Sequence, residues 1–104
     1  MNQQALLKKF KKMQDEMMET QKDIEETVFT SSAGGVVTVD VLGTKELDFI
    51  TINEDFEVES KEDLEMLAEM IVAASQACYK EIDKTTKERM DKYNSLLGGM
   101  GGLF

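Results

Sequence analysis

The chain has 104 residues, of which 32% are charged and 41% hydrophobic, enough for one small core and too apolar for a wholly disordered chain. Its net charge is -9, and the absence of histidine beside a single cysteine argues against histidine-based catalysis, an internal disulfide and a thiolate metal site. We therefore predict one non-enzymatic domain over residues 1–94, without catalytic, cofactor or metal residues, and a flexible glycine-rich tail over residues 95–104.

The first segment, residues 3–26, has the apolar spacing of an amphipathic helix. Its apolar side chains recur at steps of three, four and seven positions along one narrow face, at Leu6, Phe10, Met13, Met17 and Ile24. So narrow a stripe is typical of a coiled-coil seam, although Gln21 interrupts it with a polar side chain. The pattern predicts that a second helix covers this face.

Residues 27–52 change to the two-residue period of β-strands. We predict strands over residues 27–33, 36–42 and 46–52, joined as an antiparallel meander. Gly34 and Gly35 supply the positive φ angles of the first tight turn. A sheet of three strands has free edges, which favours either a covering helix or pairing with a second copy.

A second, longer helix is predicted from about residue 61 to residue 94, with Ser60 as its N-cap. Its first half is apolar on two faces, and its second half is much more polar. The helix is therefore expected to be buried at its start and exposed at its end. We predict an α+β fold: an N-terminal helix, a three-stranded antiparallel meander and a long C-terminal helix, assembled as a homodimer with protruding helical arms.

The charges are segregated along the chain. Residues 1–14 carry four lysines and no acid, residues 15–78 carry 3 bases and 17 acids, and residues 79–94 carry five bases and four acids. If the two helices pack antiparallel, both basic segments meet at one tip, where a polyanion could bind. The candidate DNA-binding residues are Lys8, Lys9, Lys11 and Lys12, with Lys84, Lys87, Arg89 and Lys92 as secondary contacts. The alternative is that both segments are merely solvated helix surfaces.

Three segments in this order resemble the YbaB/EbfC family of small bacterial nucleoid-associated proteins: KKFKKMQDEMMETQKDIEE, SAGGVVTVDVLG and INEDFEVESKEDLEMLAEMIVAASQACYKEIDKTTKERM. The resemblance covers nearly the whole chain. It implies a homodimer shaped like tweezers, whose helical arms bind double-stranded DNA with little sequence preference. It also implies a role in nucleoid organisation or in local control of gene expression.

Other features bear on partners and location. The lysines interrupt any signal-peptide core near the N-terminus, and no apolar run approaches the roughly 20 residues of a transmembrane helix. We therefore expect a cytoplasmic, nucleoid-associated protein without a membrane partner. An acidic dimeric adaptor, which binds proteins through its methionine- and alanine-rich surface or its acidic rim, remains the alternative function.

Overall fold

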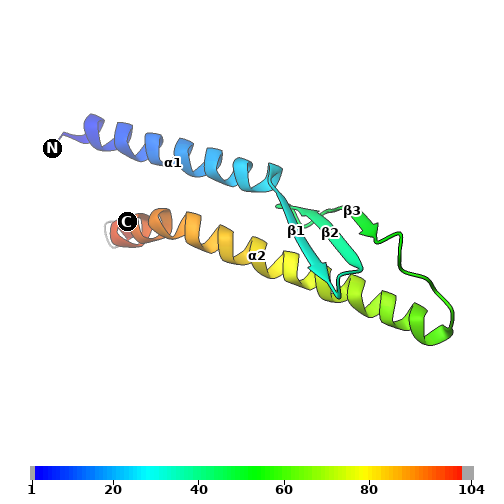
Figure 1. Cartoon of the computed structure of the whole chain (residues 1–104). Coiled ribbons are helices and arrows are strands. Elements are labelled where there is room, and N and C mark those ends of the chain that lie inside the picture. The colour runs from blue at the N-terminus through cyan, green and yellow to red at the C-terminus, as the bar shows by residue number, and fades with distance from the viewer. Residues whose placement is uncertain (1, 102–104) are drawn as a thin grey trace.

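The computed structural model describes residues 2–101, with side chains through Leu96. Two helices flank a small sheet, in the order α1 (Gln3–Glu26), β1 (Val28–Ala33), β2 (Val37–Leu42), β3 (Leu47–Ile52) and α2 (Lys61–Gly101). Helix α1 runs antiparallel to the second half of α2, so the start of α1 and the end of α2 lie at the same end of the molecule (Figure 1). The principal extents are 72 × 21 × 16 Å. The predicted α+β fold and element order are confirmed.

The core lies between the sheet and the middle of α2. The antiparallel register β1-β2-β3 turns alternate residues of β2 inward, and Val37, Val39 and Val41 have no exposed surface. They pack against Ala74, Cys78 and Ile82 of α2. The Sγ of Cys78 also donates to the carbonyl oxygens of Phe29 and Val39, at 3.5 and 3.4 Å. The lone cysteine is therefore a small core residue whose thiol ties α2 to the sheet.

The turns fix where α1 leaves the sheet. Gly34 and Gly35 adopt φ angles of 60° and 67°, as predicted for the first hairpin. In the second turn the positive φ, 75°, falls on Lys45. Gly43 is there for space, because a Cβ at this position would lie 1.7 Å from the carbonyl oxygen of Ile24. The bare glycine lets the β2–β3 turn lie against the last turn of α1, which anchors the arm.

Helix α2 is longer than its sequence suggests. The prediction that it ends at residue 94 is wrong, because the helix continues through Gly101. Each glycine costs about 1 kcal/mol in a helix, yet extending an existing helix needs no new nucleus, and Leu96 still lies against α1. The flexibility of the tail remains a prediction, and residues 102–104 lie outside the described part of the chain.

Burial along α2 also differs from the prediction of a buried start and an exposed end. The buried residues are Ala74, Cys78, Ile82 and Tyr93, because α2 meets the sheet at its middle and α1 along its second half. In the single chain its first turns are open, and Leu64 is 54% exposed. Within residues 2–101, no helix is long and apolar enough to span a membrane.

Candidate nucleic-acid interface

Helix α1 and the second half of α2 together form the arm of the protein. The sequence of α1 explains where this helix starts and how it packs. The Asn2 side chain caps the helix by accepting a hydrogen bond from the backbone N–H of Ala5 at 2.8 Å. The apolar seam faces α2, and it ends at Ile24, which is only 3% exposed. The predicted lysines of this helix, Lys8, Lys9, Lys11 and Lys12, are all exposed. Lys8 and Lys12 precede Ile24 by 16 and 12 residues, which places them ~18–24 Å out along the arm.

The end of α2 brings one further predicted base to these lysines. Lys9, Lys12 and Lys92 line the same groove between the two helices. The Nζ atom of Lys92 lies 4.9 Å from the centre of the Tyr93 ring, within the range of a cation–π contact. Lys8 and Lys11 do not line this groove. The basic end of the arm is thus built from both helices, and two of the four lysines of α1 line the groove between them.

Lys84 and Lys87 are exposed but lie nearer the base of the arm. Asp83, beside Lys84, forms an ion pair of 2.8 Å with Lys45 of the β2–β3 turn. Thr86, beside Lys87, lines a small cavity together with Ile24 at the last turn of α1. Because Lys92 follows Lys84 by eight helical positions, the two lie ~12 Å apart along α2. The predicted group on α2 is therefore spread along the arm, with Lys92 closest to the basic end.

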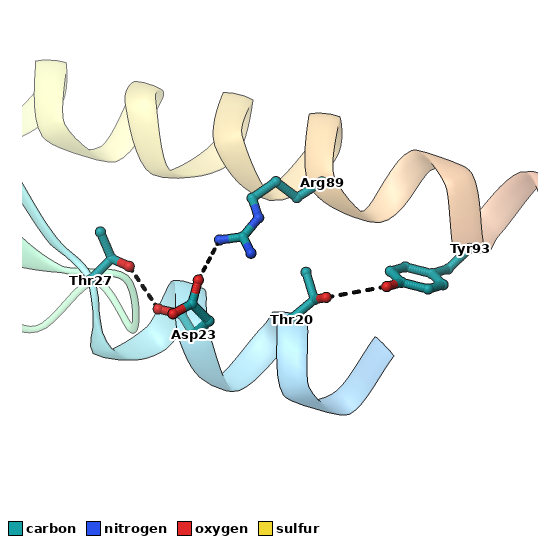
Figure 2. Close-up of polar contacts among 5 residues, drawn as sticks. All are labelled: Thr20, Asp23, Thr27, Arg89 and Tyr93. Carbon is teal, nitrogen blue, oxygen red and sulfur yellow. Dashed lines mark hydrogen bonds and ion pairs between the residues drawn. The ribbon is translucent and has the colours of Figure 1, made fainter. Parts of the chain in front are cut away.

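Arg89 is engaged in a contact between the helices (Figure 2). Its Nη1 donates to Oδ2 of Asp23 at 2.7 Å, and the hydroxyls of Thr20 and Tyr93 share a hydrogen bond of 3.2 Å. Thr27 donates to the backbone oxygen of Asp23 at 2.7 Å, which closes the end of α1. The Arg89–Asp23 and Thr20–Tyr93 contacts thus join the two helices at two positions. The Arg89 guanidinium is therefore a structural group as well as a candidate phosphate contact.

Thr20 was not among the residues predicted from the sequence, although the apolar pattern contained a signal for it. Thr20 lies three residues after Met17 and four before Ile24, which is where the apolar spacing skips a step. The predicted interruption, Gln21, is exposed and lies beside this seam. A hydroxyl fits the seam because the 4%-exposed Tyr93 supplies its partner.

Replacing Tyr93 with phenylalanine is expected to lower the free energy of unfolding by about 1 kcal/mol, because it removes one part-buried hydrogen bond and keeps the ring. Urea denaturation followed by circular dichroism measures the change. Tyr79→Phe, at a half-buried tyrosine on the same helix, is the matched control and should have a smaller effect. Equal losses in the two variants would mean that the Thr20 contact contributes nothing.

One cluster of acidic residues lies far from the basic end of the arm. The loop and first turns of α2 carry Glu54, Asp55, Glu57 and Glu59, followed by Glu62. These residues lie at the opposite end of the long axis from the N-terminal lysines (Figure 1). At physiological salt the Debye length is ~8 Å, so their repulsion of a polyanion at the arm end is largely screened.

The fold and the exposed lysines at one end of its helices define a small α+β protein with a candidate site for a polyanion. The profile of the YbaB/EbfC DNA-binding family matches residues 1–98. The chain therefore belongs to this family of nucleoid-associated DNA-binding proteins, which is not an enzyme family.

Individual relatives agree along almost the whole chain. The chain is 39% identical to a nucleoid-associated protein of Agathobacter rectalis over 104 residues, which cover 99% of this chain and 88% of the relative. It is 40% identical to a nucleoid-associated protein of Clostridium novyi, covering 100% and 90% of the two chains. The crystal structure of an uncharacterized protein from Helicobacter pylori superposes with a TM-score of 0.67 at 25% identity, covering 92% and 98%.

Proposed function

We propose that this chain forms a homodimeric nucleoid-associated protein of the cytoplasm, which binds double-stranded DNA through the ends of its helical arms with little sequence preference. The single observation that supports this most is the basic arm end. Lys8, Lys9, Lys11 and Lys12 are exposed there, and Lys92 joins two of them from the other helix.

The chemistry of this end favours phosphate contacts over base readout. A lysine ammonium is a compact point charge on a flexible stem, well suited to phosphate oxygens. Contacts to phosphates fix the position of a protein on the duplex without reading its sequence. Residues 15–78, which carry 3 bases and 17 acids, should keep the affinity for DNA modest. We expect a dissociation constant nearer micromolar than nanomolar, as is usual for non-specific binding.

The homodimer is supported by apolar surface that one chain leaves open. Helix α2 packs under β1 and β2 and contacts β3 little. Large apolar side chains on the α2-facing side of β3 and on the first half of α2 are 42–54% exposed: Leu47, Ile52, Leu64, Met66 and Val72. We call these residues the β3–α2 surface. A second copy is a suitable cover because β3 is also a sheet edge with unpaired backbone groups.

The test is fluorescence anisotropy with a labelled random-sequence duplex over a range of salt concentrations. If about four to eight phosphates are neutralised, log K should fall against log salt with a slope of about -4 to -7. Unlabelled duplexes of unrelated sequence should compete equally well. A failure to bind even at low salt would overturn the proposal and favour the acidic adaptor.

A further inference from the structure

The two helices of the arm enclose a groove whose lining differs from an ordinary helix seam. It has a volume of about 450 Å³ and lies between the first half of α1 and the end of α2. Nine described residues line it: Leu6, Lys9, Phe10, Lys12, Met13, Glu16, Lys92, Tyr93 and Leu96. Small-molecule sites typically occupy ~300–1,000 Å³ and combine a mainly apolar lining with a few polar groups. The groove fits this description.

The lining has two chemically distinct parts. The floor is apolar, because Leu6, Phe10 and Met13 follow one another at helical spacing on α1 and face Leu96 of α2. The charged groups in the lining are three lysines, Lys9, Lys12 and Lys92, and one carboxylate, Glu16. An occupant that matches both parts has an apolar chain and a negatively charged head.

We propose that this groove binds a single-chain anionic amphiphile, such as a long-chain carboxylate. Its hydrocarbon chain lies on the apolar floor, and its head lies between Lys9, Lys12 and Lys92. The occupant is a single chain rather than a bilayer because Leu6, Phe10 and Met13 line a groove between two helices and not a flat open face. Burial of the chain supplies most of the affinity, and the lysines select the charge of the head.

Occupation of the groove has a consequence that rests on the proposed function. Lys9, Lys12 and Lys92 are also candidate phosphate contacts, so a carboxylate held by them competes with the DNA backbone for the same charges. Lys8 and Lys11 lie outside the groove lining. The amphiphile therefore weakens DNA binding by lowering the number of lysines available to phosphates.

The direct test uses the full chain without DNA. The probe is cis-parinaric acid, whose fluorescence rises in an apolar site, used below its micellar concentration. We expect saturable binding that laurate displaces, whereas acetate does not displace the probe and dodecanol displaces it more weakly. Binding should be at least tenfold weaker, or about 1.4 kcal/mol, in the Lys9→Gln/Lys12→Gln variant.

Two matched comparisons separate the groove from general charge or apolar attraction. The Lys8→Gln/Lys11→Gln variant has the same net charge as the groove pair and should bind the probe nearly as well as the parent. Leu96→Glu should abolish binding, whereas Met18→Glu, at a 67%-exposed site outside the lining, should not. Circular dichroism verifies that every variant is folded.

Three results would overturn the inference: no saturable probe binding, equal losses in the two lysine pairs, or binding to phosphatidylglycerol vesicles but not to monomeric laurate. The last result would assign the surface to a membrane instead. Competition is then measured by adding laurate to the DNA complex. The probe assay contains no DNA. It therefore tests amphiphile binding even if the protein does not bind DNA.

Discussion

Replacing Lys8, Lys9, Lys11 and Lys12 by glutamine is expected to lower the affinity for duplex DNA roughly 100-fold or more at low salt. These residues supply four charges per protomer at the arm end, and each lost phosphate contact makes the salt slope shallower by about one. The slope should therefore flatten by several units. Fluorescence anisotropy against salt concentration measures both quantities.

The same substitutions should barely change folding. All four side chains are exposed on α1, and surface substitutions away from packed features usually alter stability by less than about 0.5 kcal/mol. Replacing Lys22, Lys45 and Lys61, the three bases of residues 15–78, by glutamine removes three charges elsewhere and is the control for net charge. That triple variant should retain most of the affinity. If the triple variant loses as much affinity for DNA as the quadruple variant, overall charge governs binding and the arm end is not the binding site.

A second comparison ranks the two basic segments. Replacing Lys84, Lys87 and Lys92 should weaken binding less than the α1 substitutions, because only Lys92 lies beside the α1 lysines. Arg89 is left out of this variant since its guanidinium already forms an ion pair with Asp23, so its substitution would change a contact between the helices as well as a charge. A larger loss from the α2 variant would move the DNA site to the base of the arm.

Much of the fold was predictable because local rules and tertiary packing agree. The bounds of α1, Gln3–Glu26, match the amphipathic segment of the sequence. Each strand begins one residue later than predicted, a difference within the ordinary uncertainty of element ends. Ser60 was predicted as an N-cap, and its Oγ accepts a hydrogen bond from the Asp63 N–H at 3.3 Å. Here propensity, capping and periodicity all favour the same structure.

Burial was less predictable because it depends on how the elements are offset from one another. Tyr93 is nearly fully buried although its helix segment is polar, since α1 extends far enough back along α2 to cover it. The exposed Leu64 lies on a rich apolar stripe that the short sheet does not reach. Periodicity identifies the apolar face of a helix, but it does not state which part of that face a partner covers.

The candidate site shows the same limit. The spacing of Leu6, Phe10 and Met13 marks the seam of α1, so the position of Lys9 beside this seam could be worked out from the sequence. That Lys92 shares the groove depends on the offset between α1 and α2, which no local pattern encodes. The basic residues predicted from the sequence therefore do not form one group. In the structure, some lie at the end of the arm, some lie at its base, and Arg89 forms an ion pair.

Dimerisation and DNA binding should be coupled. A dimer carries two arms, and the second arm binds DNA at a high effective concentration once the first is bound. Loss of the dimer halves the number of phosphate contacts and so also makes the salt slope shallower. A monomeric variant with intact lysines is therefore expected to bind DNA weakly. Its molecular mass in solution distinguishes it from the lysine variants, which should remain dimers.

The double substitution Leu64→Glu/Val72→Glu should convert the protein to a monomer of 11.7 kDa. In the single chain these residues are 54% and 53% exposed, on the part of α2 that the sheet leaves open. Because a two-fold dimer contains both protomers in the same interface, each substitution is present there twice. An unpaired buried charge costs about 3–5 kcal/mol, so even one buried glutamate per protomer weakens the dimer by roughly 10⁴-fold. Size-exclusion chromatography with light scattering measures the mass.

The matched control is Leu7→Glu/Met18→Glu, which introduces the same charges at apolar residues of α1 that are 65% and 67% exposed. This variant should remain a dimer, because neither residue belongs to the β3–α2 surface. A parent protein that elutes as a folded monomer at every concentration would contradict the dimer. If both double variants dissociate equally, added negative charge rather than a particular interface separates the protomers. Dissociation of the α2 variant alone would identify the first half of α2 as the surface on which the second copy packs.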